Sequence, residues 1–173
     1  LSVMIFHRVL PRPDPNAPGA TDAERFDRVL RWVRSWFNVI PLDMAVRSLG
    51  DGTLPSRALA ITFDDGYADN HDVAMPLLLR HGLSATFFVA TGFLDGGRMW
   101  NDTIASAVHR TAPAPLDLTP LGQPGLGRFN LDSPAQRSSS LSAIIDAVKY
   151  FPTGHRADVA DAIGRIAAIE PDA

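Results

Sequence analysis

Runs of apolar residues alternate with amphipathic stretches along the first 90 positions of the chain. Continuous apolar runs between turn residues predict buried strands at 2–6, 58–63 and 85–90, with a shorter strand at 39–40. In the same part of the chain, helical spacing predicts helices over 21–37, 43–49 and 70–81, the last of them weakened by an internal proline. Strands that alternate with helices imply parallel pairing, so the pattern predicts an α/β fold.

The second half of the chain shows helical patterns and one long loop. In chain order the predicted elements are a helix over 101–110, a Pro-, Gly- and Leu-rich loop over 111–130, a helix that Ser133 caps and Pro134 opens, and a last helix that opens at Thr153. In the last helix, Val159, Ile163 and Ile166 are predicted to face the core. In the first helix of the chain, Thr21 and Glu24 have the spacing of a capping box.

Composition narrows the classes of protein to consider. The 173 residues are 46% apolar and carry 16 basic against 19 acidic side chains, a net charge of −3, which argues against a nucleic-acid partner. We see no apolar run long enough for a transmembrane segment and no signal peptide, and the compartment stays open between cytoplasm and cell envelope. Since cysteine is absent, any metal must be held by His, Asp or Glu.

The stretch most informative about chemistry is Asp64-Asp65-Gly66, at the end of the predicted strand 58–63. Two adjacent carboxylates repel each other unless they share a cation or a proton. In parallel α/β folds the carboxyl ends of the strands form the active face, and a glycine allows the sharp turn that brings both side chains to one cavity. The alternative is that the two aspartates merely cap the following helix.

Three sequence motifs together resemble the polysaccharide deacetylase family, the NodB-like carbohydrate esterases. They are T-F-D-D-G-Y at 62–67, A-T-F-F-V at 85–89, and F-H-R at 6–8. The resemblance covers residue 1 to about residue 100. It implies a partial, deformed (β/α) barrel whose N-terminal part is 1–100, with 101–173 as a helical insertion or extension of the same domain.

The resemblance also implies a reaction and a cofactor. In that family the residue at Asp64 is the general base toward the attacking water, and the residue at Asp65 is a ligand of a divalent metal, for which we expect zinc. Two histidines of an H-x-x-x-H motif complete the metal site. The histidines of this chain, which are His7, His71, His81, His109 and His155, contain no pair with that spacing. We therefore expect that the metal site is incomplete, that the parent protein continues, and that this fragment alone is inactive.

Four further residues are candidates for substrate binding: His7, Tyr67, Trp100 and Asn101. His7 ends the first strand, on the same predicted face as Asp64. Each candidate also has a structural alternative to substrate binding. His7 is then a buried histidine with a backbone partner, and Tyr67 an amphipathic rim residue. Trp100 is then a core side chain, and Asn101 a helix cap.

The sequence thus predicts a metal-dependent hydrolase that removes acetyl groups from an N-acetylated or O-acetylated polysaccharide or glycoconjugate. A non-catalytic carbohydrate-binding pseudoenzyme domain is the alternative. Phosphoryl transfer is weaker, because D-x-D spacing and a Gly-rich phosphate loop are absent. The edge of an unfinished barrel also predicts self-association.

Overall fold

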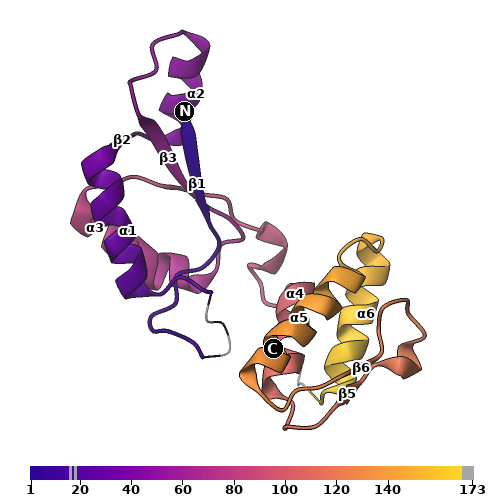
Figure 1. Cartoon of the computed structure of the whole chain (residues 1–173). Helices are drawn as coiled ribbons and strands as arrows, with labels where there is room; N and C mark the ends of the chain where they lie inside the picture. Colours follow the sequence, from indigo (N-terminus) through magenta and orange to yellow (C-terminus); the bar gives the residue numbers. More distant parts are fainter. Residues whose placement is uncertain (16, 18, 169–173) are drawn as a thin grey trace. The chain divides into compact units, whose positions relative to one another are not determined.

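Strand β3 (Ala58–Phe63) is the centre of a four-stranded parallel sheet in this computed structural model, which describes residues 1–15, 17 and 19–168 (Figure 1). Its partners are β1 (Ser2–Phe6), β2 (Asn38–Val39) and β4 (Thr86–Phe87). β1 pairs with β3 along one edge, from Ser2 opposite Leu59 to Phe6 opposite Phe63. β2 and β4 share the other edge, at the start and the end of β3 respectively. All six β3 residues are buried, as its unbroken apolar sequence predicts.

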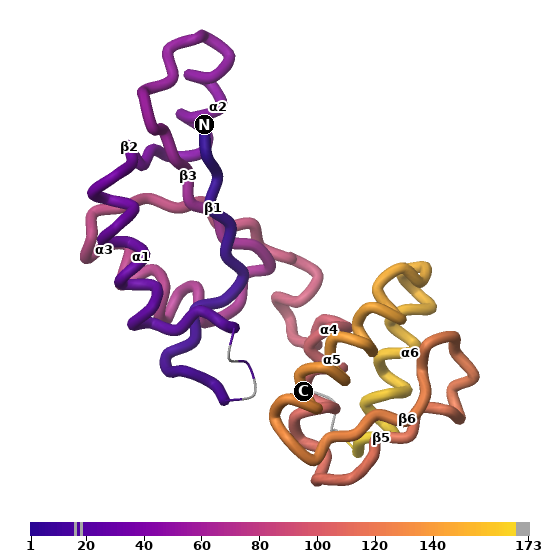
Figure 2. The backbone as a smooth tube through the Cα atoms, viewed as in Figure 1, coloured from indigo at the N-terminus to yellow at the C-terminus, as the bar shows by residue number. Residues whose placement is uncertain are grey.

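The helices of this part are α1 (Ala23–Trp36), α2 (Leu42–Gly50), a π-helical turn η1 (Asn70–Ala74) and α3 (Met75–His81). In Figures 1 and 2, α1 and α3 lie side by side against the sheet. Phe26 of α1 meets Phe6 and Phe63 edge-on, with ring centroids 5.0 and 5.8 Å apart. Phe63 also stacks on Phe6 and Phe87. This aromatic cluster packs α1 against the ends of β1 and β3 and, through Phe63, includes the end of β4.

An ionic cluster links α1 to α3. Asp27 of α1 accepts hydrogen bonds from Arg80 and from His81, the latter at 2.6 Å, and lies 3.6 Å from Arg31. The bond from His81, followed by that from Arg80, lowers the pKa of Asp27 below its ordinary value. The carboxylate is therefore ionised at neutral pH, where it attracts the two arginines and accepts the hydrogen bond from His81.

The second part of the chain is mainly helical. Its elements are α4 (Trp100–Arg110), a hairpin of β5 (Leu116–Asp117) and β6 (Arg128–Phe129), α5 (Pro134–Val148) and α6 (Thr153–Ile166), with short 3-10 turns η2 (Thr91–Phe93) and η3 (Thr119–Leu121). The helices pack around a core of their own. Arg137 of α5 is buried and donates to the carbonyls of Val108, His109 and Thr111, which satisfies the end of α4.

Several boundaries differ from those that the sequence predicts. Asp22 caps α1 by accepting from the Arg25 N–H (3.0 Å), so the cap assigned to Thr21 is wrong by one residue. The strand predicted over 85–90 keeps two residues, and the predicted loop 111–130 contains the β5–β6 hairpin. Ile166 is 41% exposed, because it lies in the last turn of α6. Ser133 caps α5 as predicted.

The chain divides into two compact units, Leu1–Thr91 and Gly92–Ala173, here called unit 1 and unit 2. The division lies near the predicted boundary at residue 100, and the joining of both parts in one domain stays a prediction; residues 169–173 lie outside the described part. The architecture is mixed α/β, as predicted, although the strands described here do not close into a barrel. None of the described helices is long and apolar enough to cross a membrane.

Candidate active site at the strand ends of unit 1

The carboxyl ends of β1, β3 and β4 meet at one edge of the sheet. The Asp64 N–H donates to the carbonyl of Phe6 (2.9 Å), and the Phe88 N–H donates to the carbonyl of Phe63 (2.8 Å). His7 and Asp64 are therefore neighbours on adjacent strand ends, about 5 Å apart along the pairing direction. His7 is exposed, whereas Asp64 is half-buried. This places two of the predicted site residues at the edge where α/β proteins bind ligands.

Asp65 occupies an unusual backbone conformation. Its φ is 73°, in the left-handed region, and the Gly66 N–H donates to the Asp64 carbonyl (3.0 Å) across it. A three-residue turn around a residue of positive φ is rare and strained, although aspartate tolerates it better than most residues. The Ala90 N–H fixes the turn from the side by donating to the Asp65 carbonyl (3.1 Å). Strain held in place by neighbouring bonds is typical of functional sites.

The two aspartates do not cap the next helix. The helical conformation that leads into η1 begins at Ala68, so Asp64 and Asp65 stand outside its first turn. Both carboxylates are half-buried at the end of a buried strand. The alternative of simple capping is thus excluded, while their catalytic and metal-binding roles remain predictions.

Asp69 and Arg8, which sequence reasoning missed, join the two strand ends of the candidate site. Asp69 is 8% exposed; one oxygen accepts from Arg8 Nε (2.8 Å) and the other from the Val9 N–H (3.2 Å). The Arg8 guanidinium carbon in turn lies 4.6 Å from the centre of the Tyr67 ring. These contacts tie the segment after β1 to the segment after β3. A buried acid such as Asp69 needs a hydrogen-bond donor as its partner. The only signal for this partner in the sequence is the position of Arg8 directly after His7.

Asn70 begins the π-helical turn η1, in which the Met75 N–H bonds to the Asn70 carbonyl. Pro76 has no N–H to donate within the helix, which accounts for the irregular turn just before it. The Asn70 residue is 4% exposed, and its side-chain nitrogen and oxygen have no hydrogen-bond partner among the described residues. A buried amide in this state lowers stability.

Replacing Asn70 by Leu is expected to raise the free energy of unfolding by about 0.5 kcal/mol, since leucine has similar size, needs no partner and favours helix. Chemical denaturation of the two proteins measures this difference. Asn70→Asp is the control, and it should destabilise unit 1 by placing a charge in the same buried position. A clear loss of stability in Asn70→Leu would show that the amide has a partner, such as a buried water.

Gly66 has a φ of 78°, and a Cβ at this position would lie 2.8 Å from Cγ1 of Val89. Gly66→Ala is therefore expected to lower the free energy of unfolding by about 1–3 kcal/mol. Gly50→Ala is a matched control, because a Cβ there meets nothing within 4 Å. Equal stability of Gly66→Ala and the parent protein in a denaturant titration would contradict the tight packing of this turn.

The other two predicted substrate-binding residues lie in unit 2. Trp100 and Asn101 occupy the first turn of α4, whose cap position is Met99, so Asn101 is inside the helix. The Trp100 ring packs against the core of unit 2, and the guanidinium carbon of Arg156 lies 4.9 Å from its centre. Their roles toward a substrate remain predictions.

A divalent metal would find part of its ligand set at the strand ends. The Asp64 and Asp65 carboxylates are hard oxygen donors, and their half-buried position beside a strained turn suits a shared cation. Among the described residues, however, no group of three His, Asp or Glu side chains lies close enough together to hold a metal ion. Since a catalytic zinc takes three protein ligands, these residues fit the metal only as a partial site.

Comparisons with known proteins point to one family. Residues 51–112, which contain Asp64 and Asp65, match the polysaccharide deacetylase family model. The chain is 25% identical over 91 residues to the putative polysaccharide deacetylase YxkH of Bacillus subtilis (strain 168). That alignment covers 51% of this chain but only 31% of YxkH, so the chain spans about a third of this relative.

Among solved structures, the chain is similar to a de-N-acetylase from Aggregatibacter actinomycetemcomitans (27% identity, TM-score 0.46, 54% of this chain and 38% of that one). It is also similar to IcaB from Ammonifex degensii (18% identity, TM-score 0.49, 97% and 80% of the two chains). The predicted resemblance to polysaccharide deacetylases is thus confirmed by the family match over the stretch that carries the aspartate pair.

Proposed function

We propose that the protein to which this chain belongs is a metal-dependent deacetylase that removes acetyl groups from an N-acetylated or O-acetylated polysaccharide or glycoconjugate. The observation that carries the proposal is the half-buried pair Asp64 and Asp65, in a strained turn at the carboxyl end of a buried strand, inside the stretch that matches the family. The wider fold would be the deformed (β/α) barrel of these enzymes.

In this mechanism the two carboxylates have different tasks. Asp64 takes a proton from the water that attacks the acetyl carbonyl, and Asp65 helps to hold the divalent metal, for which zinc is the proposed identity. When bound, the metal polarises the acetyl oxygen and stabilises the charge that develops on it. The strained backbone at Asp65 favours the reaction by holding its carboxylate in one orientation before substrate arrives.

Arg8 and Asp69 are proposed to position the site rather than to react. Asp69 is bonded to the backbone and side chain of the segment that follows His7, so it fixes the distance between the ends of β1 and β3. His7 and Tyr67 lie beside this link and are proposed to contact the sugar. We extend the same role to Trp100 and Asn101, and the edge of β1 that has no partner among the described strands is proposed as the surface of self-association.

The test is acetate release from acetylated oligosaccharides by the protein that contains this chain, with N-acetylated and O-acetylated substrates compared side by side. Release should stop in the presence of a chelator and return when zinc is added. The 173-residue chain alone should release none, because its metal site is partial.

If a chelator leaves acetate release unchanged, the proposed dependence on a metal is contradicted. If the folded, zinc-supplied protein binds the oligosaccharide but releases no acetate from either substrate, the proposal fails in favour of a carbohydrate-binding pseudoenzyme.

A further inference from the structure

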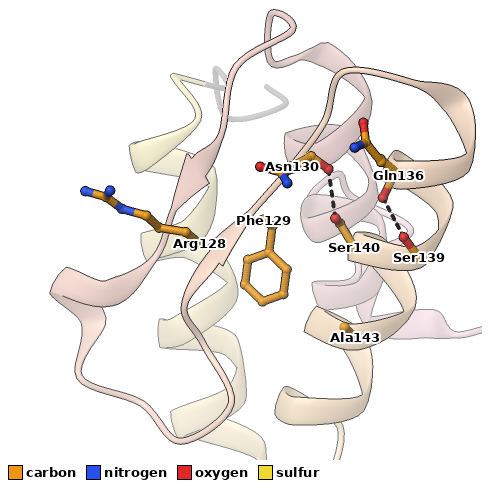
Figure 3. Close-up of a pocket in the computed structure, with 7 residues that line it drawn as sticks. All are labelled: Arg128, Phe129, Asn130, Gln136, Ser139, Ser140 and Ala143. Carbon is orange, nitrogen blue, oxygen red and sulfur yellow. Dashed lines mark hydrogen bonds between the residues drawn. The ribbon is translucent and has the colours of Figure 1, made fainter.

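Unit 2 contains a pocket that the reaction proposed for unit 1 does not use. It lies between β6 and α5, with a volume of about 350 Å³ (Figure 3). This volume is near the lower end of the range of small-molecule sites, about 300–1,000 Å³. The wall on the strand side is formed by 128–130, and the wall on the helix side by Gln136, Ser139, Ser140 and Ala143.

Hydrogen bonds fix both walls of the pocket. The Ser140 hydroxyl is buried and donates to the Asn130 carbonyl (3.0 Å), which joins α5 to the segment after β6. Ser139 donates to the Gln136 carbonyl (3.0 Å), and the Gln136 side-chain oxygen accepts from Ser133 (3.3 Å). The bond between Ser140 and Asn130 spans the two walls, so the pocket is formed before any ligand binds.

The groups that line the pocket are polar but carry little net charge. None of the seven described residues that form it is acidic, and its one cation, Arg128, donates through Nε to Asp117 (2.9 Å), which balances its charge. The remaining polar groups are the amides of Asn130 and Gln136 and the serine hydroxyls, which can donate and accept. An anionic ligand would need unbalanced cations, so this lining favours a neutral ligand rich in hydroxyl or amide groups.

One aromatic ring completes the lining. Phe129 is half-buried; part of it packs against the core of unit 2, and Figure 3 shows its ring between β6 and α5. An aromatic surface beside amides and hydroxyls matches a pyranose ring, whose C–H groups form an apolar face and whose hydroxyls point outward around its edge. The volume suits one such ring rather than several.

We propose that this pocket binds one uncharged sugar unit of a glycan, with the ring against Phe129 and its hydroxyl or acetamido groups bonded to Asn130 and Gln136. The inference deepens the proposed function, on which it rests for the identity of the glycan: it gives the same acetylated polymer a second point of attachment, in unit 2.

The test uses the whole 173-residue chain, labelled with ¹⁵N, titrated with the neutral trisaccharide of N-acetylglucosamine and, separately, with trigalacturonic acid. We expect saturable shift changes at the backbone amides of 129–130 and 136–143 with the neutral sugar and much weaker changes with the anionic one. Ala143→Phe, which fills the pocket from an exposed helix position, and Asn130→Ala should each weaken binding roughly tenfold.

Ala135→Phe is the matched control, since Ala135 is an exposed residue of α5 that does not line the pocket. It should bind the neutral sugar like the parent chain. Binding that survives both Ala143→Phe and Asn130→Ala, preference for the anionic sugar, or no saturable binding by the folded chain would each overturn the inference. Sugar binding in the absence of acetate release by the protein that contains this chain would instead overturn the proposed reaction and leave the pocket assigned.

Discussion

Asp64→Asn is expected to lower the rate of acetate release by the protein that contains this chain by about 10²–10⁴-fold. The amide keeps the size of the side chain but cannot take a proton from the attacking water. Since the Asp64 backbone, and not its side chain, joins β3 to β1, the fold should be unchanged. Steady-state kinetics under zinc-saturated conditions measure the loss.

Asp72→Asn is the matched control for this substitution. Asp72 lies in the same segment, but its side chain is 69% exposed and pairs with His71 at the surface. This variant should retain full activity. In Asp65→Asn, bound metal should fall together with the rate, whereas Asp64→Asn should keep its metal. Near-normal turnover in Asp64→Asn would remove this residue from the reaction and with it the central claim of the proposed mechanism.

Phe63→Ala is expected to lower the free energy of unfolding of unit 1 by about 3–5 kcal/mol. Phe63 is fully buried, and its ring contacts three other aromatic rings, with centroids 4.9–5.8 Å apart. Since Phe63 directly precedes Asp64 in the chain, acetate release by the protein that contains this chain should fall as well. Hydrogen exchange of peptides from β1 and β3 reports on unit 1 separately from unit 2.

The control for the cavity is Phe88→Ala. Phe88 is 50% exposed, so removing its ring should cost much less than removing that of Phe63. Comparable losses in the two variants would contradict the central place of Phe63 in the packing of the sheet.

The sequence predicts where β1 and β3 lie, but it predicts burial correctly only for β3. The strands at 2–6 and 58–63 have the predicted boundaries because each is a continuous apolar run. All six residues of β3 are buried, whereas the prediction of a buried strand at 2–6 is wrong: β1 is the outer strand of the described sheet, and its Val3 and Ile5 are exposed. The strand predicted over 85–90 is shorter, because only its second and third residues find partners on β3. The β5–β6 hairpin has two residue pairs, too few for periodicity to detect.

The residues of the candidate site likewise fall into those that a local sequence pattern reveals and those that it does not. The aspartate pair was found because acids at the end of an apolar strand stand out in a sequence. The bonds from Arg8 and Val9 to Asp69 join residues about 60 positions apart, and local patterns contain no information about such pairing. The left-handed backbone at Asp65 was likewise not predicted, since glycine, and not aspartate, is the residue from which such a conformation is expected.

The central position of β3 has a consequence for biosynthesis. In the described sheet, β1, β2 and β4 each pair with β3 alone. Before residues 58–63 have been made, β1 and β2 therefore lack their partner and their backbone groups must be hydrated. Sheet formation has to wait until 58–63 has left the exit tunnel, and the slow, non-local step of folding falls at that moment. Until then, the apolar nascent segment around β1 has an unpaired strand edge and is prone to aggregate.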